Sequence, residues 1–251
     1  IGQTPTPLMY FACEKLGTLS GVMVTGSHNP PDYNGLKILL DGNNLAGEEL
    51  KELYQRIQQR DFLTGVGSKN TADIVEDYVK RVVGDVRLSR SVKIVIDAGN
   101  GVAGLIAPRL LQELGCDVIE LNCEVDGTFP GHHPNPSEPE NLKDLINAVA
   151  QYEAELGIAF DGDGDRLGVV DANGNPIWPD RLMIMFAQDV LSRQPAATII
   201  YDVKSSNMLA DSIMRAGGEA VMSASGHSII KNKIREMDAQ LAGEMSGHIF
   251  F

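Results

Sequence analysis

Residues 156–171, LGIAFDGDGDRLGVVD, place an acidic, glycine-rich segment between two apolar runs of strand length. Asp161, Asp163 and Asp165 occupy alternate positions, so in an extended segment their side chains point the same way, with Cα atoms roughly 6.5–7 Å apart. Three carboxylates at that spacing repel one another, and a hard divalent cation with oxygen ligands removes the repulsion. The two intervening glycines let the backbone curl around an ion. The segment predicts a metal-binding loop between two strands, with a solvated acidic turn as the alternative.

A calcium-binding helix–loop–helix site does not fit this segment. That pattern needs glycine at its sixth position and a bidentate glutamate at its twelfth, where this chain has Arg166 and Ala172. The calcium-loop interpretation is therefore excluded.

Outward from this segment, apolar strand-like runs alternate with amphipathic helical stretches, which is the pattern of α/β proteins with mainly parallel sheets. Polar, glycine-rich breaks at 64–70 and 171–176 divide the chain into three units of similar size. The expected domains are residues 1–70, 71–175 and 176–251. The expected strands are 21–24, 35–40, 92–97, 117–121, 156–160, 167–171 and 198–203, and the expected helices are 47–59, 71–83, 103–114, 139–152, 180–193, 206–216 and 228–237.

Composition narrows the class of protein. The 251 residues, 43% hydrophobic and 22% charged, describe an ordinary globular chain that can bury a real core. The net charge of −13 argues against a nucleic-acid partner, because no basic stripe is available to displace counterions from phosphates. The three cysteines lack metal-ligand spacing and predict reduced thiols in a cytoplasmic protein. No apolar run reaches membrane-spanning length. The chain has no initiator Met and stops within an apolar run, so we expect it to be a piece of a longer protein.

A polar turn, Thr25-Gly26-Ser27-His28-Asn29-Pro30, follows the expected strand 21–24. A serine lifted on such a turn is well placed as a nucleophile or as a phosphate carrier. Ordinary turn chemistry is the alternative, because serine is common in turns. A hydrolase elbow does not fit, since the order Gly-x-Ser-x-Gly is absent around Ser27.

Residues 99–104, GNGVAG, satisfy Gly-x-Gly-x-x-Gly directly after the expected strand 92–97, and Glu120 lies where a ribose-binding acid would be expected. A nicotinamide-dependent oxidoreductase is therefore an alternative function. A tight strand-to-helix turn also needs glycines without any dinucleotide, and the oxidoreductase hypothesis explains neither the acidic segment nor the turn at Ser27.

Residues 243–248, GEMSGH, combine a carboxylate, a hydroxyl and an imidazole on a glycine-flanked loop. Sugar hydroxyls need such paired donors and acceptors, although a turn that joins two strands is the alternative. His227 precedes an expected helix whose exposed amides are able to hold an anion. Lys204 ends an expected strand, where it either meets a phosphate or projects into solvent.

Taken together and in this order, these motifs resemble the α-D-phosphohexomutase family. The turn at Ser27 is similar to its phosphoserine loop, residues 161–166 to its magnesium loop, and residues 243–248 to its sugar-recognition loop. The similarity extends over nearly the whole chain and includes residues 97–101, DAGNG, and residues 129–134, FPGHHP. Met245 and the stretch 30–35 look most like the bacterial phosphomannomutase/phosphoglucomutase branch, whereas phosphoglucosamine mutases usually carry Gln at the position of Met245.

The resemblance implies four domains: three related three-layer α/β domains with mixed, mainly parallel sheets, and a fourth that grips the substrate phosphate. This chain matches most of the first domain, all of the second and much of the third, and it lacks an arginine that the family places near the nucleophile. The implied activity is that of an isomerase, which moves a phosphoryl group between O1 and O6 of a hexose phosphate through a phosphoserine and a bound 1,6-bisphosphate. We expect little turnover from these residues alone. A phosphoglucosamine mutase and a non-catalytic phosphosugar-binding relative remain alternatives.

The resemblance also implies roles for individual residues. It implies one Mg²⁺ held by Asp161, Asp163, Asp165 and a phosphoserine oxygen at Ser27. The implied catalytic residues are Ser27, Lys37, Arg166, His28 and His248, and the implied substrate contacts are Glu244, Ser246, His248, His227, Lys204 and Asn29. An activator of the glucose 1,6-bisphosphate type, a hexose phosphate as the partner, no nucleic acid, no membrane and a monomeric state are expected.

Two departures from the family pattern weaken the expected contacts in the third domain. Asn207 and Met208 stand where relatives often have basic residues, and Ala224 and Ser225 replace a usual Lys-Thr pair. Both changes leave the predicted metal and serine loops in place.

Overall fold

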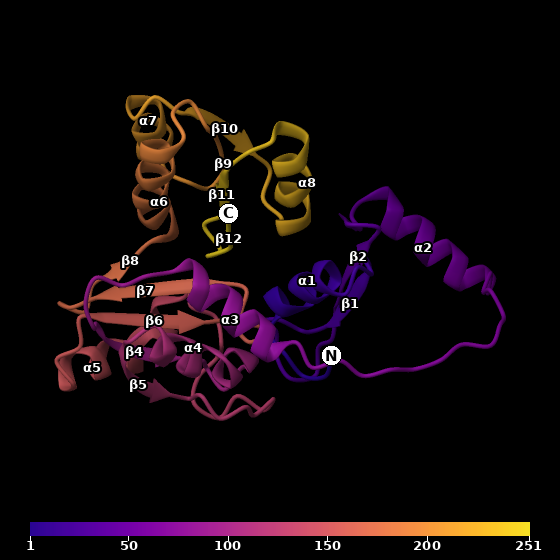
Figure 1. Cartoon of the computed structure of the whole chain (residues 1–251), viewed down its shortest axis with the longest axis horizontal. Helices are drawn as coiled ribbons and strands as arrows, with labels where there is room; N and C mark the ends of the chain where they lie inside the picture. The colour runs from indigo at the N-terminus through magenta and orange to yellow at the C-terminus, as the bar shows by residue number, and fades with distance from the viewer.

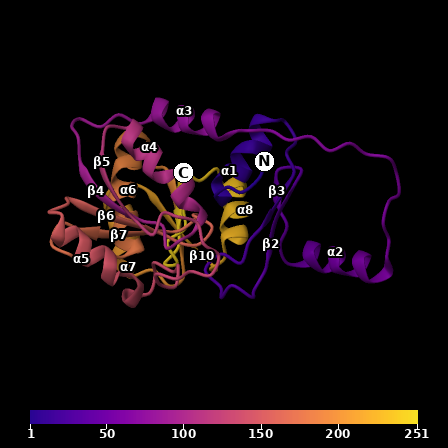
Figure 2. The same ribbon diagram turned by 90° about the horizontal axis from the view of Figure 1, so that it is seen from below.

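A computed structural model describes residues 1–251 and contains three sheets that follow one another along the chain (Figure 1). The first sheet has the order β1-β2-β3, with β1 at Gly21–Val24, β2 at Leu36–Leu40 and β3 at Asn43–Asn44. Both of its strand pairs are antiparallel. Helix α1 (Thr6–Lys15) packs on one face through Met9 and Cys13, which contact Leu39. Helix α2 (Glu48–Gln59) buries no residue and stands away from the rest of the chain (Figures 1 and 2).

The second sheet has the order β5-β4-β6-β7-β8. Its central strand β4 pairs in parallel with β5 and β6, whereas β6, β7 and β8 are joined by antiparallel pairing. The bounds of the strands are β4 Lys93–Asp97, β5 Asp117–Leu121, β6 Leu156–Phe160, β7 Leu167–Asp171 and β8 Pro176–Ile177. The helical elements are α3 Val75–Asp85, η1 Val102–Leu105, α4 Ala107–Glu113, η2 Pro139–Leu142 and α5 Lys143–Gln151.

The core of this second unit lies on both faces of the sheet. Alternate residues of a strand point to opposite faces. Val95 therefore packs with Leu145 of α5, whereas Ile94 and Ile96 pack with Leu111 of α4. The arrangement is three-layered, with a helix on each side of the strands.

The third sheet has the order β10-β9-β11-β12, with parallel pairing of β9 to β10 and β11 and antiparallel pairing of β11 to β12. Helices α6 and α7 cover one face through a core that includes Ile199 and Ile213, and α8 covers the other through Ile200 and Ile230. The bounds are α6 Pro179–Arg193, β9 Thr198–Asp202, α7 Asn207–Arg215, β10 Glu219–Ser223, α8 His227–Met237, β11 Leu241–Gly243 and β12 Ile249–Phe250.

The predicted α/β class with consecutive three-layer units and mixed sheets is confirmed, with two differences in detail. The first sheet is wholly antiparallel, because the loop 25–35 returns the chain directly and no crossover helix intervenes. The polar break 171–176 is the turn of the hairpin between β7 and β8, so the predicted boundary after residue 175 falls inside the second sheet. The exact domain limits otherwise stay a prediction.

The three cysteines, Cys13, Cys116 and Cys123, form no disulfide with one another. None of the helices combines the length and the apolar character that crossing a bilayer requires.

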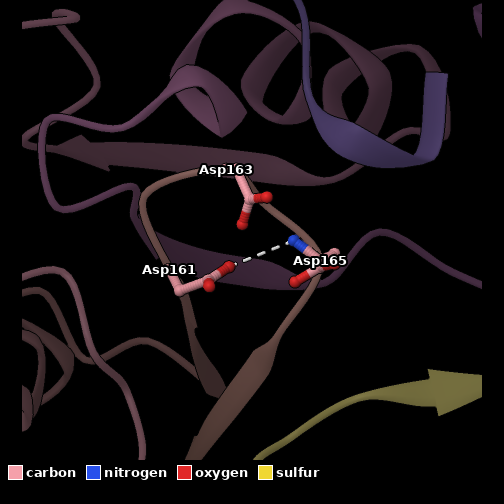
Figure 3. A group of neighbouring side chains, drawn as sticks. All are labelled: Asp161, Asp163 and Asp165. Carbon is pink, nitrogen blue, oxygen red and sulfur yellow. Dashed lines mark hydrogen bonds between the residues drawn. The ribbon is translucent and has the colours of Figure 1, made fainter. Parts of the chain in front are cut away.

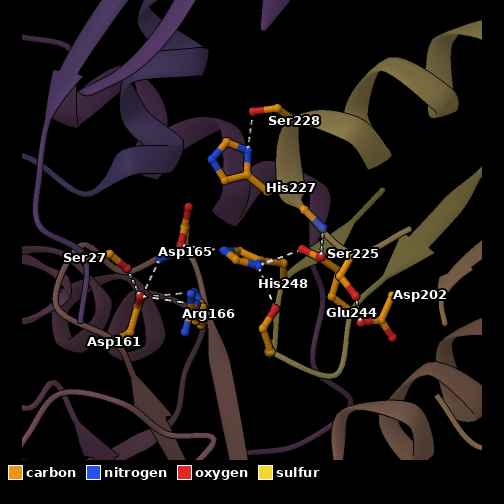
Figure 4. Close-up of polar contacts among 12 residues, drawn as sticks. Ser27, Asp161, Asp165, Arg166, Asp202, Ser225, His227, Ser228, Glu244 and His248 are labelled. Carbon is orange, nitrogen blue, oxygen red and sulfur yellow. Dashed lines mark hydrogen bonds and ion pairs between the residues drawn. The ribbon is translucent and has the colours of Figure 1, made fainter. Parts of the chain in front are cut away.

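The architecture brings three loops together. The loop after β1 carries Ser27, the loop between β6 and β7 carries residues 161–166, and the loop between β11 and β12 carries residues 244–248. Each loop comes from a different sheet, so the site lies where the three units meet (Figure 4).

Candidate active site

The turn at Ser27 rests on the acidic loop of the second unit. The Ser27 hydroxyl donates a 2.7 Å hydrogen bond to Oδ2 of Asp161 (Figure 4). Its Oγ lies 3.2 Å from Nδ1 of His28. Ser27 has a left-handed backbone with φ of 53°, and its amide donates to Oγ1 of Thr25 at 2.7 Å. A non-glycine residue in this conformation is uncommon and is often found at functional sites. The turn therefore holds the serine hydroxyl toward the predicted metal loop.

The backbones of the two loops touch at Gly162. A Cβ atom at this position would collide with the carbonyl oxygen of Ser27. Only glycine leaves room for such a close approach. Gly162 thus serves to bring the loops together, in addition to letting the acidic segment turn.

The three aspartates form one cluster, as the sequence predicts. Asp161, Asp163 and Asp165 each offer a carboxylate oxygen, and these oxygens lie within 4.8 Å of one another (Figure 3). Asp161 Oδ1 accepts the amide hydrogens of Asp165 and Arg166, both at 3.1 Å. These bonds close the loop around the first carboxylate, so the segment is a tight turn rather than the extended strand assumed from the sequence.

Two groups from the first unit complete the cluster. Lys37, on β2, places its ammonium 2.6 Å from Asp163 Oδ2 and 2.5 Å from Asp165 Oδ2. Thr6, at the start of α1, donates its hydroxyl to Asp163 Oδ2 at 2.6 Å. Burial by itself lowers the pKa of Lys37, but the charges of Asp165 and Asp163 outweigh it and raise this pKa above its ordinary value.

The carboxylates differ in their affinity for protons. Burial, followed by the charges of Asp163 and Asp165, raises the pKa of Asp161 to about 7. Burial also acts to raise the pKa of Asp165, but hydrogen bonds and charges from His248 and Lys37 bring it below its ordinary value. Repulsion within the cluster is therefore only partly relieved by the protein's own cations.

The donor set fits a hard divalent cation. Asp163 Oδ1 is buried and has no hydrogen-bond partner, although a buried carboxylate oxygen is costly to leave unsatisfied. Carboxylate oxygens, together with a serine oxygen beside them, are the ligand type that Mg²⁺ prefers. Asp161, Asp163, Asp165 and Ser27 are the residues that would hold such an ion.

Arg166 and His28 flank the junction between the serine and the aspartates. Nε of Arg166 lies 3.7 Å from Asp161 Oδ2, is buried, and has no hydrogen-bond partner. Burial, with the charges of Arg166 and His133, lowers the pKa of His28 to about 4. The guanidinium thus offers an unused donor to an anion, and His28 is a neutral neighbour of Ser27.

The third loop reaches the aspartates through His248. Its Nε2 lies 3.1 Å from Asp165 Oδ1, and its Nδ1 lies 2.9 Å from both Ser246 Oγ and Glu244 Oε2. Glu244 Oε2 has no well-directed hydrogen bond, so its contact with His248 is chiefly electrostatic, while the other carboxylate oxygen accepts the amide of Gly226 at 2.6 Å. Burial acts to lower the pKa of His248, but Asp165 and Glu244 raise it to about 8.

The remaining predicted residues lie at the margin of this cluster. The His227 ring is 5.7 Å from that of His248, and burial lowers its pKa to about 4. Lys204 is exposed and lies 3.9 Å from Asp202 Oδ2, so it does not join the central cluster. Asn29 is exposed on the serine turn, where its amide donates to Gly26. Ser225, one of the departures from the family pattern, donates to Asp202 at 2.9 Å.

Sequence reasoning missed three residues around the cluster. Besides Thr6, these are Tyr10 and Lys231, whose ammonium lies 3.2 Å from the centre of the Tyr10 ring. Lys231 lines a cavity of about 480 Å³ that also borders Asp165 and His248, and burial lowers its pKa to about 7. None of the three belongs to a recognisable motif, and only the fold brings them to the site.

The glycine pattern at 99–104 has a structural explanation that needs no dinucleotide. A Cβ at Gly101 would lie 2.7 Å from the carbonyl oxygen of Gly162, and one at Gly104 would collide with the backbone of Cys123. The amide of Val102, which a phosphate-binding turn would leave free, donates to the Gly162 carbonyl at 3.1 Å. The glycines pack the turn against the acidic loop 161–166, so the oxidoreductase alternative loses its support.

Comparison with known proteins agrees with the motifs. Domain models described as phosphoglucomutase/phosphomannomutase, alpha/beta/alpha domains I, II and III, match residues 1–64, 76–174 and 178–251 in that order. The chain belongs to the phosphoglucomutase/phosphomannomutase family. The resemblance inferred from the motifs is confirmed.

Relatives of the family are similar over the whole chain. A phosphomannomutase/phosphoglucomutase of Pseudomonas aeruginosa is 55% identical over 251 residues, which cover 100% of this chain and 54% of the relative. A phosphoglucomutase of Neisseria meningitidis is 53% identical over 253 residues, covering 100% of this chain and 55% of the relative. The crystal structure of a phosphoglucomutase/phosphomannomutase family protein from Burkholderia thailandensis superposes with a TM-score of 0.94 at 50% identity, covering 99% of this chain and 56% of that one. The chain thus spans about half the length of these relatives.

Proposed function

We propose that the full-length protein containing this chain is a phosphohexomutase that acts on mannose and glucose phosphates. The observation that carries this proposal is the contact of the Ser27 hydroxyl with Asp161, inside a cluster that a hard cation fits and beside the loop that carries Glu244 and His248. One bound ligand would thus meet a serine that carries phosphate, a cation that compensates negative charge, and groups that bind sugar hydroxyls. The names of the relatives support the same function.

The proposed reaction has two halves. In the first, the P–O bond to Ser27 breaks while a P–O bond forms to a free hydroxyl of the hexose phosphate, whose proton passes to a nearby base. The Ser27 oxygen takes up a proton as it leaves, and the resulting 1,6-bisphosphate rotates in the site. In the second half, the Ser27 hydroxyl gives up its proton while its oxygen bonds to the other phosphoryl group, the P–O bond from that group to the sugar breaks, and the sugar oxygen takes up a proton. A bound Mg²⁺ would supply positive charge where negative charge develops in phosphoryl transfer.

The residues of the chain have distinct proposed roles. Arg166, with its unused buried Nε–H, binds an oxygen of the transferring group. Lys37 and His248 each place a protonated nitrogen on Asp165, and they are the candidates for carrying the proton of the sugar hydroxyl. His28 orients Ser27, with which it shares a 3.2 Å contact.

Recognition of the sugar is assigned to the third loop and its surroundings. Ser246 offers a hydroxyl, and Glu244 offers a carboxylate oxygen without a well-directed partner. His227 borders this loop through His248, and Lys204 and Asn29 are proposed as outer contacts of the substrate phosphate. A 1,6-bisphosphate is proposed as the activator, because it phosphorylates Ser27 when the phosphoryl group has been lost.

The experiment that tests the proposal is an activity comparison with the full-length protein. With Mg²⁺ and a trace of 1,6-bisphosphate, we expect conversion of mannose 1-phosphate and glucose 1-phosphate to the 6-phosphates at rates far above that of glucosamine 1-phosphate. A preference for glucosamine 1-phosphate would instead identify a phosphoglucosamine mutase. Binding of all three without turnover would identify a non-catalytic relative and would overturn the proposal.

A further inference from the structure

The segment 126–134, which no role assigned so far explains, lies between a buried carboxylate and the turn that carries Ser27. The carboxylate belongs to Asp97, at the end of β4, and it is fully buried. Its Oδ1 accepts the Gly99 amide at 3.0 Å and the Asn122 side-chain amide at 3.1 Å. Its Oδ2 lies 2.8 Å from Nε2 of His132. Asp97 is thus a rigid anchor to which His132 is attached.

The geometry of His132 indicates a charged imidazole. Its Nε2 faces the Asp97 carboxylate, and its Nδ1 lies 3.0 Å from the carbonyl oxygen of His133. Both partners are acceptors, and only the protonated ring donates from both nitrogens. The hydrogen bond to Asp97 is the chief cause that raises the pKa of His132 to about 9, while Asp144 adds a smaller effect in the same direction. The charged ring holds the backbone of its own segment in place.

The segment also contains a strained residue. Phe129 has a left-handed backbone with φ of 51°, which is unfavourable for a bulky side chain. Its amide donates to the Asp126 carbonyl at 3.0 Å, and the amide of Asp126 donates to the Asn100 carbonyl at 3.0 Å. Strain of this kind persists only where the surroundings hold it, and it is often found next to functional groups.

The residues that flank His132 in the sequence, Phe129 and His133, contact the serine turn or the loop packed against it. A Cβ at Gly162, the residue in contact with the Ser27 carbonyl, would lie 3.5 Å from Cζ of Phe129, so the phenyl ring lies against this junction. On the other side, the rings of His133 and His28 stand edge to face, 6.4 Å between centres. A displacement of residues 129–133 would therefore be felt at both Gly162 and His28.

We propose that residues 126–134 position the nucleophile, with His132 as the positioning residue: anchored on Asp97, it holds Phe129 and His133 against Gly162 and His28 and so fixes the direction of the Ser27 hydroxyl. This inference rests on the proposed phosphoryl transfer at Ser27. His132 makes no hydrogen bond or ion pair to the residues assigned to the metal or the substrate, so it acts on the rate of transfer and not on substrate affinity.

The test compares three variants of the full-length protein. His132→Ala is expected to lower kcat at least about tenfold with KM nearly unchanged, because a small misplacement of a reacting group is costly. His133→Ala, at an exposed position, is expected to leave the fold intact and to lower kcat severalfold in the same way. Val149→Ala removes core volume between α5 and the sheet of the same unit. It is expected to leave kcat at the wild-type value.

A second readout separates this inference from the mutase proposal. In the NMR spectrum of the 251-residue chain at pH 8, the imidazole signal of His28 is expected to move by more than its linewidth in His132→Ala and in His133→Ala, but not in Val149→Ala. If the wild-type protein proves to have no mutase activity, this measurement alone decides the positioning role. An unmoved signal in both histidine variants, or wild-type kcat in both, overturns the inference. So does an equal loss of kcat in Val149→Ala. If His132→Ala does not fold, His133→Ala decides by the same criteria.

Discussion

The hydroxyl of Ser27 donates a 2.7 Å hydrogen bond to Oδ2 of Asp161, although 134 positions separate the two residues in the sequence. The contact joins the first unit of the fold to the second, and Gly162 allows the two backbones to touch beside it. The serine turn and the acidic loop therefore behave as one structural element. Five predictions test this element and its surroundings.

Gly162→Ala is expected to push the two loops apart. The added methyl group would collide with the Ser27 carbonyl, and relieving the collision requires backbone movement that costs about 1–3 kcal/mol. Thermal unfolding should show a lower melting temperature, and Ser27 should lose most of its capacity to accept phosphate. The control is Gly84→Ala in α3, where a Cβ meets no atom within 4 Å and an alanine favours the helix. Equal behaviour of the two variants would contradict the close approach at Gly162.

Asp163→Asn should weaken the binding of Mg²⁺ to the chain by at least about tenfold, since even groups that only support metal ligands contribute that much. Isothermal titration calorimetry with the 251-residue chain measures this directly. Asp144→Asn, the same change at an exposed position of α5, should bind Mg²⁺ like the wild type. The assignment of the ligands fails if the two variants bind equally well.

Lys37→Met is expected to strengthen the binding of Mg²⁺, in contrast to Asp163→Asn. The Lys37 ammonium lies 2.6 Å from Asp163 Oδ2 and 2.5 Å from Asp165 Oδ2. It therefore neutralises negative charge that would otherwise attract a divalent cation. Its removal should tighten Mg²⁺ binding and at the same time abolish most of the activity of the full-length protein. Lys51→Met on the exposed helix α2 should change neither property. Weaker Mg²⁺ binding in Lys37→Met would show that the ammonium supports the site and does not compete with the ion.

His132→Gln should destabilise the protein in a pH-dependent way. Asp97 raises the pKa of His132 from 6.5 to about 9, so the folded state binds this proton more tightly than the unfolded state. The resulting stabilisation is fully present below pH 6.5 and is lost as the pH rises through about 9. The difference in melting temperature between wild type and variant should therefore be largest near pH 6 and shrink near pH 9.5. A difference that stays constant over this range would argue against a charged His132.

The regular elements were predictable where pattern and packing agree. The strands β5, β6 and β7 have the bounds expected from their apolar runs, since helices pack on both faces of this sheet. Short strands such as β3 and β8 have two residues each, too few for a period to be recognised. Strand β10, with the sequence EAVMS, was missed because its alternation of apolar and polar residues is weak. It is stabilised by its parallel pairing with β9, which the local sequence does not reveal.

The site was predictable only in part. Alternating aspartates indicated a cation, and the turn at Ser27 indicated a nucleophile, but no local pattern shows that the two share a hydrogen bond. Thr6 and Lys231 belong to no motif, and they reach the cluster only because α1 and α8 come together around it. Lys204 follows β9 and lies beside Asp202, outside the central cluster, so its contact with the substrate phosphate stays a prediction.

The most direct test of the central claim is the intact mass of the full-length protein after incubation with glucose 1,6-bisphosphate and Mg²⁺. If Ser27 carries phosphate beside a cation held by the three aspartates, a species about 80 Da heavier, the mass of one phosphoryl group, should form and map to Ser27. It should be absent from Ser27→Ala and form far more slowly when the metal is chelated. No added mass at saturating Mg²⁺, or an equal added mass in Ser27→Ala, would contradict the account.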